Sequence, residues 1–225
     1  MLENAIINVN GDAVQALDIS LLLVIITLLP TLVVMMTSFT RYVISFSFLR
    51  TAMGTQQTPP NLVLVGMALI LTLFTMAPTM DAIATNAYEP YSEGLITQEE
   101  FFERAQDPLK RFMLRNTEVQ SLELFCNMSG VQGPASEEEM EQSIELPLRV
   151  IVPAFVTSEL KAAFWIGFLL YIPFMLIDVI VSSTLMSMGM IMLPPSMIST
   201  PFKILLFILL DGWQLLFSTL VQGIN

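Results

Sequence analysis

The residues of this 225-residue chain that could do chemistry are few, and the first group is a run of methionines. Four of the 16 methionines stand at alternate positions: Met186, Met188, Met190 and Met192. On a single helix they would fall on two opposite faces, so one lipid-facing stripe does not explain all four. Gly189 within the run and Pro194-Pro195 after it favour a loop or broken turn. Because thioethers are flexible and polarizable, the run fits a deformable seal that closes around different chains.

Two other interpretations of the methionine run stay open. One is ordinary apolar packing. The other is soft-metal chemistry, because Met-x-Met-x-Met spacing also suits Cu(I), which makes a copper-handling membrane protein an alternative. The chain has no His, and Cys126 is its only cysteine, so the usual companion ligands for copper are scarce. We therefore expect no metal site and no cofactor.

The second group consists of charged residues inside apolar sequence: Glu159, Lys161, Asp178, Lys203 and Asp211. A charge at the bilayer centre costs roughly 2.5–3.5 kcal/mol, so each should face protein or water and find a partner. Glu159 and Lys203 stand at the starts of two expected apolar helices, about level in a hairpin or between neighbouring copies. We expect these two to pair, with interfacial snorkelling of Lys203 as the alternative. A proton relay through Asp178 and Asp211 would instead indicate a proton-coupled transporter of small solutes.

The composition around these residues indicates a membrane-associated, helical protein. Hydrophobic residues make up 54% of the chain, charged residues 13%, and the mean hydropathy is +0.70. The net charge of -11, from 9 basic and 20 acidic residues, argues against a nucleic-acid binder. The absence of His removes the common catalytic triads and the usual zinc sites, and a single cysteine forbids an internal disulfide. We expect no enzymatic activity.

Four predominantly apolar stretches are long enough to predict spanning helices, near 20–40, 62–80, 162–182 and 201–222, the third interrupted by Asp178 and the fourth by Lys203 and Asp211. The positive-inside rule places the loops that carry Arg41, Arg50 and Lys203 on the cytoplasmic side. Both termini and the long middle segment would then lie on the opposite side of the membrane. Prolines interrupt these runs and favour bent hairpins over straight rods: Pro30, Pro78, Pro173 and Pro194-Pro195.

The predicted fold class is all-α, with kinked helical hairpins and a small extracytoplasmic helical segment between them. Residues 1–18 form an N-terminal segment without a visible signal peptide, and because an outside N-terminus usually needs one, we expect a processed chain. The first hairpin covers 19–87, the acidic extracytoplasmic region 88–150, and the second hairpin with the methionine-rich loop 151–225. Within the acidic region, Thr97 with Glu99 and Glu100 predicts a capped helix over 97–105.

Further short amphipathic helices are expected after that helix, because apolar residues recur at helical spacing: Leu109, Phe112, Met113, Val119, Leu122 and Phe125. Turn signals stand at Glu89-Pro90, at Asp107-Pro108 and from Gly130 to Pro134. The acidic stretch within 127–146 stays unassigned.

Three long motifs of the chain follow the pattern of one protein family. Pro153-Ala-Phe-Val-Thr-Ser-Glu-Leu-Lys161 followed by Phe-Trp-Ile-Gly-Phe is similar to one family signature, and Pro201-Phe-Lys-Ile-Leu-Leu-Phe-Ile-Leu-Leu-Asp-Gly-Trp213 is similar to the second. Met35-Met-Thr-Ser-Phe-Thr-Arg41, with Leu49-Arg50 and Gly54-Thr55 downstream, resembles the first hairpin. Together these motifs resemble the FliP family of flagellar and type III secretion export proteins, and the resemblance covers residues 20–90 and 108–225.

This resemblance implies an oligomeric export gate in the bacterial inner membrane, at the flagellar basal body, with extensive periplasmic exposure. About five such subunits would join FliQ- and FliR-type subunits and other export apparatus proteins, in contact with lipid, and pass unfolded flagellar subunits needed for flagellum assembly. In the assembled gate the helices of the family sit largely above the plane of the bilayer.

The resemblance also assigns roles to individual residues. The pore gasket would fall on Met188, Met190, Ile191 and Met192, with Ile191 standing where many members carry another Met. An inter-subunit salt bridge would fall on Glu159 and Lys203. Phe112 and Phe125 would correspond to positions that build the ring.

Overall fold

The computed structural model describes residues 6–9, 12–15, 23–24, 26–28, 31, 34–55, 57–134, 140–190 and 192–224. The elements in chain order are β1 (Ile6–Val9), β2 (Asp12–Gln15), α2 (Phe39–Met53), α3 (Asn61–Ile83), the π-helical turn η1 (Ala84–Tyr88), α4 (Glu89–Ser92), α5 (Gln98–Arg115), α6 (Val119–Ser129), the 3-10 turn η2 (Glu141–Glu145), α8 (Leu148–Ser187), α9 (Pro195–Leu209) and α10 (Gly212–Gln222). Helices dominate, which confirms the all-α fold class. The strands form one short antiparallel hairpin, with Ile6 opposite Gln15.

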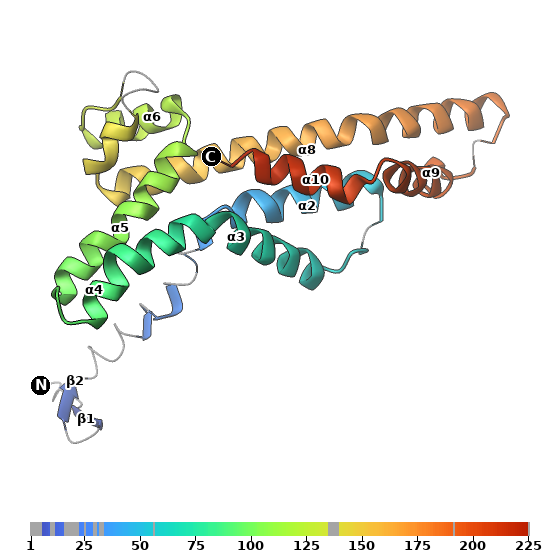
Figure 1. The fold of residues 1–225 in the computed structure, drawn as a ribbon. Helices are drawn as coiled ribbons and strands as arrows, with labels where there is room; N and C mark the ends of the chain where they lie inside the picture. Colours follow the sequence, from blue (N-terminus) through green and yellow to red (C-terminus); the bar gives the residue numbers. More distant parts are fainter. Residues whose placement is uncertain are drawn as a thin grey trace, which may run out of the picture.

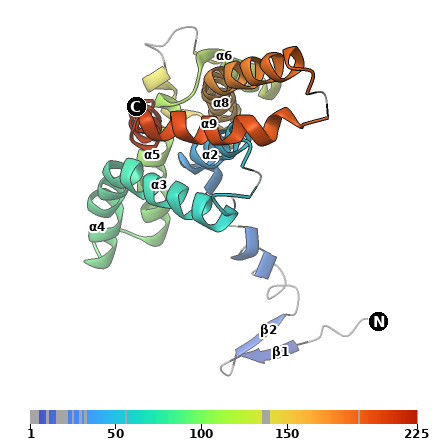
Figure 2. The ribbon, with the colours of Figure 1, turned by 90° about the vertical axis from the view of Figure 1, so that its right-hand side faces the viewer.

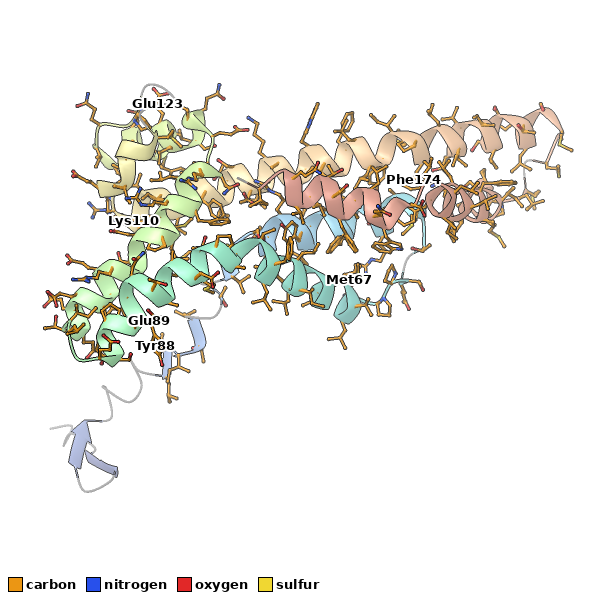
Figure 3. The ribbon with its side chains drawn as sticks, in the orientation of Figure 1. Met67, Tyr88, Glu89, Lys110, Glu123 and Phe174 are labelled. Atoms are coloured by element: carbon orange, nitrogen blue, oxygen red, sulfur yellow. The ribbon has the colours of Figure 1, made fainter. Side chains whose placement is uncertain are left out.

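The helices form a long shaft with a helical head at one end (Figure 1). Helices α2, α8, α9 and α10 run along the shaft, whereas α4, α5 and α6 gather at the opposite end from the α8–α9 connection. Viewed end-on, α2 lies between α8 and α3 (Figure 2), and α2 packs against both. Phe174 of α8, labelled in Figure 3, is buried beside Phe207 of α9, which in turn contacts Trp213 of α10.

Helix α2 corrects the expected first hairpin, in which Arg41 and Arg50 would lie in a cytoplasmic loop. Both arginines are helical, and α2 supplies three large side chains that are completely buried: Tyr42, Phe46 and Leu49. Their spacing of three and four residues places them on one helical face. The hydrophobic gain from packing that face between α3 and α8 explains why this segment is core rather than loop. Of the predicted span at 20–40, residues 20–22, 25, 29–30 and 32–33 lie outside the described residues.

Two helical stretches of the described chain are long and apolar enough to cross a bilayer, Asn61–Ser92 and Leu148–Ser187. The expected helix at 162–182 is therefore part of a single 40-residue helix, α8, which continues through Pro153 and Pro173. The expected helix at 201–222 is broken instead, because α9 and α10 meet at 65° with Asp211 in the left-handed conformation at φ 49°. The sharp breaks thus fall at 188–194 and 210–211.

The head confirms the predicted cap and corrects two predicted turns. Thr97 caps α5 in a reciprocal capping box, in which its hydroxyl accepts from the Glu100 N–H and the Glu100 carboxylate accepts from the Thr97 N–H. The Asp107-Pro108 turn does not form, since α5 runs through Pro108 to Arg115. Phe112 packs against Phe155 of α8 with ring centroids 5.8 Å apart, and this burial compensates for the hydrogen bond that proline removes. The Glu89-Pro90 pair is likewise helical, in α4 directly after η1.

Candidate functional site

The methionine run forms the connection between α8 and α9, at the end of the shaft. Helix α8 ends in a Schellman motif, in which the Met190 N–H donates to the Leu185 carbonyl and the Gly189 N–H donates to the Met186 carbonyl, both at 3.0 Å. Gly189 adopts φ 74°, a conformation that side-chain-bearing residues rarely take. Pro194 and Pro195 then begin α9. The loop expected from Gly189 and the proline pair is therefore present.

Most thioethers of this turn, which we call the methionine tip (residues 186–192), are exposed in the single chain. Met186 and Met188 are exposed, Met190 is half-buried, and the Met192 side chain is 98% exposed. Ile191 lies outside the described residues. Exposed groups of apolar side chains often mark a surface that contacts another protein or a membrane. The tip thus offers several flexible apolar side chains to whatever lies beyond the shaft.

A buried ion pair joins α2 to α8 in the middle of the molecule. Nε of Arg41 donates to Oε2 of Glu159 at 2.8 Å, and Nη2 donates to Oε1 at 2.5 Å. Glu159 is completely buried and Arg41 is 5% exposed. Arg41 also donates through Nη1 to the Gly223 carbonyl after α10. This bidentate geometry satisfies both carboxylate oxygens, as a buried charge requires.

A second ion pair ties α8 to α9 nearer the methionine tip. Nζ of Lys203 lies 2.6 Å from Oδ2 of Asp178 and donates to the Ala52 carbonyl of α2 at 3.1 Å. Ser199 donates to the other Asp178 oxygen at 2.7 Å. Because Lys203 is buried, it does not snorkel to solvent in the single chain. Three helices therefore converge on one ammonium group.

The expected partners Glu159 and Lys203 do not meet within one chain. They are not level, because Lys203 contacts Asp178, and Asp178 lies 19 residues beyond Glu159 on the same helix, about 28 Å along its axis. Each already has another partner. Their pairing between neighbouring copies concerns a second chain and stays a prediction.

The two aromatic residues assigned to ring assembly belong to the hydrophobic core of the head. Phe112 is buried in a cluster that includes Met113, Leu122 and Phe155, and Phe125 is half-buried against it. Neither offers a fully exposed ring to a second copy. Their assembly role stays a prediction, and in the single chain both hold α5 and α6 onto α8.

The two aspartates of the proton-relay alternative, Asp178 and Asp211, have different surroundings. Asp178 is held by Lys203 and Ser199, whereas Asp211 is exposed at the bend between α9 and α10. Among the described residues, no group of three or more His, Cys, Asp or Glu side chains could hold a metal ion.

Sequence reasoning missed Arg41 as the partner of Glu159, although a signal was available. Arg41 stands four residues before Ser45 and eight before Leu49, so its position belongs to a helical face of buried residues. A cation on such a face needs an anion from another apolar helix, and few acidic residues lie in apolar sequence. Glu159 is one of them.

Known proteins resemble the chain along almost its whole length. The profile of the FliP family matches residues 22–220. The flagellar biosynthetic protein FliP of Aquifex aeolicus is 46% identical over 213 residues, which cover 95% of this chain and 87% of the relative. That of Bacillus subtilis is 48% identical over 203 residues, covering 90% and 89%, and that of Pectobacterium carotovorum is 46% identical over 219 residues, covering 95% and 81%. With a matching profile and relatives this similar, the chain that carries the methionine tip and the two ion pairs belongs to the FliP family.

Proposed function

We propose that this chain is a pore-forming subunit of the flagellar type III protein export gate, required for flagellum assembly. The relatives bear the name flagellar biosynthetic protein, which supports a role in flagellar export. The observation that carries the pore proposal is the methionine tip, an exposed group of thioethers at the end of a long apolar hairpin. Several copies arranged around one axis would bring their tips together and close a channel.

The chemistry of the tip matches the task of passing many different unfolded flagellar subunits. A rigid constriction would fit one chain only, whereas Met188, Met190 and Met192 can repack around side chains of different size. Apolar side chains also exclude ions, because a hydrophobic constriction dewets. Ile191 keeps the constriction apolar at the position between them.

About five copies with FliQ- and FliR-type subunits form the proposed assembly, in the inner membrane and exposed to the periplasm. The exposed apolar surface of the shaft supports partners or lipid on several sides: Leu73, Phe74, Phe164, Phe168 and Leu176 are among the exposed large side chains. So many exposed apolar side chains would favour aggregation if the protein stayed alone in water.

The gasket is tested by the ion conductance of the gate, reconstituted in vesicles with its partner subunits. Replacing Met190 and Met192 together with Gly should raise the ion leak under export-competent conditions by about tenfold or more, because the dry constriction widens. Met175→Ala is the matched control, since Met175 is exposed on α8 outside the tip and should leave the leak unchanged. Equal conductance of the double variant and the wild type would count against the gasket.

A further inference from the structure

A large cavity lies where the head meets the shaft, and it gathers positive charge. Its volume is about 1080 Å³, and its walls come from the end of α5, the first turn of α6, residues 158–162 of α8 and the end of α10. Figure 1 shows the C-terminal end of α10 reaching this junction. Only one of the 20 acidic residues of the chain, Glu118, lines the cavity. Four of the nine basic residues line it: Arg41, Arg111, Arg115 and Lys161.

Three of these four cations already have partners within the chain. Arg41 and Lys161 each pair with a carboxylate, and Arg115 also has an interaction within the chain. Arg111 differs from them, because its side chain is exposed and, among the described residues, it forms no ion pair. Arg111 is therefore the cation that a ligand of the cavity can use without breaking an existing contact.

The first turn of α6 adds hydrogen-bond donors to the same cavity. Val119 and Gln120 line it, and N–H groups in the first turn of a helix have no partner within that helix. Within the described chain, the carboxylate of the N-cap residue Glu118 does not cap this turn and pairs with Lys161 instead. The positive end of the α6 dipole thus faces the same space as Arg111, and both favour an anionic ligand.

A stripe of exposed aromatic side chains leaves the mouth of the cavity along α8. Lys161 stands at the mouth, and Phe164, Trp165 and Phe168 follow it by three, four and seven residues, which places them on one helical face. All three rings are more than half exposed, and Trp165 stacks on Phe168 with ring centroids 6.0 Å apart. We call these three residues the aromatic stripe. A ligand anchored in the cavity can therefore continue over an apolar surface.

The position of the cavity along α8 suits a lipid headgroup. Beyond Lys161 the helix continues to Ser187, about 39 Å, with Asp178 as the one charged residue on the way. This length exceeds the hydrocarbon core of about 30 Å. Tryptophan at the start of such a stretch is typical of the interface between lipid and water. The cations of the cavity therefore stand at the end of the apolar stretch where headgroups begin.

We propose that the cavity binds the phosphate of an anionic phospholipid, with Arg111 as its main cation and the aromatic stripe as the surface for the acyl chains. Guanidinium groups suit phosphate oxygens because they donate in a planar, forked geometry. A lipid explains two features that inorganic phosphate does not, namely the size of the cavity and the apolar stripe at its mouth. The site lies within one chain, so it does not depend on the pore proposal.

The test measures phospholipid binding to the full-length chain, purified in mild detergent and depleted of lipid, by native mass spectrometry. Phosphatidylglycerol should bind about fivefold more tightly than zwitterionic phosphatidylcholine, because Arg111 recognises the net negative charge. The comparison is informative because the chain itself carries a net charge of -11 and would repel an anionic lipid that had no local site. Equal affinity for the two lipids would overturn the proposal.

Arg111→Gln should weaken phosphatidylglycerol binding by about fivefold, whereas Arg111→Lys, which keeps the charge, should retain most of the affinity. Arg149→Gln is the matched control, since Arg149 is exposed on α8 and does not line the cavity. Thermal unfolding without lipid verifies that these exposed positions leave the fold intact. If Arg111→Gln and Arg149→Gln bind phosphatidylglycerol equally well, the cavity is not the lipid site.

The aromatic stripe is tested with Trp165→Ala, which should weaken phosphatidylglycerol binding by about threefold, because acyl contacts are lost. Phe102→Ala is the control, since Phe102 is similarly exposed on α5 and does not line the cavity. Inorganic phosphate and a short polyglutamate peptide serve as competitors. Displacement of the lipid by phosphate at equal concentration would mean that the acyl chains contribute nothing, and displacement by the peptide would indicate a protein ligand. Either result would overturn the lipid assignment.

Discussion

At the scale of single residues, the buried pair Arg41–Glu159 decides how α2 sits on α8. A buried ion pair adds little net stability compared with apolar side chains of the same size, but losing one partner leaves an uncompensated charge. The pair therefore acts mainly on register, because any shift of α2 along α8 separates the two groups. Lys203 and Asp178 perform the same task for α9.

Replacing Arg41 with Ala should destabilise the chain by about 3–5 kcal/mol, because among the described residues Arg41 is the cation that pairs with the buried Glu159. Thermal unfolding in detergent measures this loss. Arg50→Ala serves as the control, since Arg50 contacts Asn61 and the Pro59 carbonyl rather than an acidic residue. The double variant R41A/E159Q should regain part of the stability, and melting of R41A at the wild-type temperature would contradict the assignment.

The partner of Glu159 in the assembled gate can be identified by charge exchange. Glu159→Lys should impair both folding and assembly, because it places two cations together beside Arg41. If Glu159 keeps Arg41, then Arg41→Glu restores ring formation. If Glu159 exchanges Arg41 for Lys203 of a neighbouring copy on assembly, Lys203→Glu restores it instead. Ring formation by native mass spectrometry is the readout, and rescue by neither second change would remove both pairings.

At the scale of elements, local hydrogen-bonding motifs mark the ends of helices, whereas burial decides what happens between those ends. The capping box starts α5 at Thr97, and the Schellman motif ends α8 at Gly189. Between those points, burial overrides unfavourable residues, since Pro108, Pro153 and Pro173 all lie inside continuous helices.

The cap of α5 should respond to mutation and to pH in a definite direction. Thr97→Ala should cost about 1 kcal/mol of local stability. The hydrogen bond from the Thr97 N–H lowers the pKa of the Glu100 carboxyl from its usual 4.5. Since a lowered pKa stabilises the folded form above the unfolded pKa, this contribution is present at neutral pH and is lost as the pH falls below about 4.5 through the lowered pKa.

Hydrogen exchange of the first turn of α5 measures both effects. Thr97→Ala should speed exchange at neutral pH, whereas Glu100→Ala should abolish the acid-induced increase that remains after correction for intrinsic rates, because it removes the carboxylate that accepts from the Thr97 N–H. Thr157→Ala, a change at an exposed threonine inside α8, is the control. A first turn that exchanges at the same corrected rate in both variants and at every pH would contradict the cap.

At the scale of the whole molecule, the shaft is longer than a bilayer is thick. Helix α8 has 40 residues and is therefore about 60 Å long, whereas the hydrocarbon core spans about 30 Å. Part of α8 must lie outside the hydrocarbon, or the helix must be steeply tilted. Glu159 of the buried ion pair lies in the first third of α8, nearer the head, and exposed apolar side chains follow it toward the methionine tip.

Cysteine labelling in permeabilised cells should show how α8 divides between water and lipid. In a C126S background, Thr157→Cys near the head should react with a membrane-impermeant maleimide, because the side chain is exposed and lies beside the polar head. Leu176→Cys, also exposed in the single chain, should stay unreactive because lipid or partner subunits cover it. Equal labelling of both positions would mean that the apolar half of α8 is not covered.

Much of the fold follows from local signals in the sequence. The apolar runs around 62–80 and 162–182 form helices, Thr97 caps one, and Gly189 with the proline pair turns the chain. These features depend on residues within one or two turns of each other, so short-range rules apply to them. The membership in the FliP family likewise follows from contiguous motifs.

Only the tertiary structure shows which groups pair with the buried charges and that α2 packs in the core between α3 and α8. Arg41 and Glu159 are 118 positions apart, and Lys203 meets Asp178 only because α8 is long enough to pass beside α9. Contacts of this kind depend on which helical faces pack together and in what register. That choice is set by the summed burial of many side chains, which no local pattern contains.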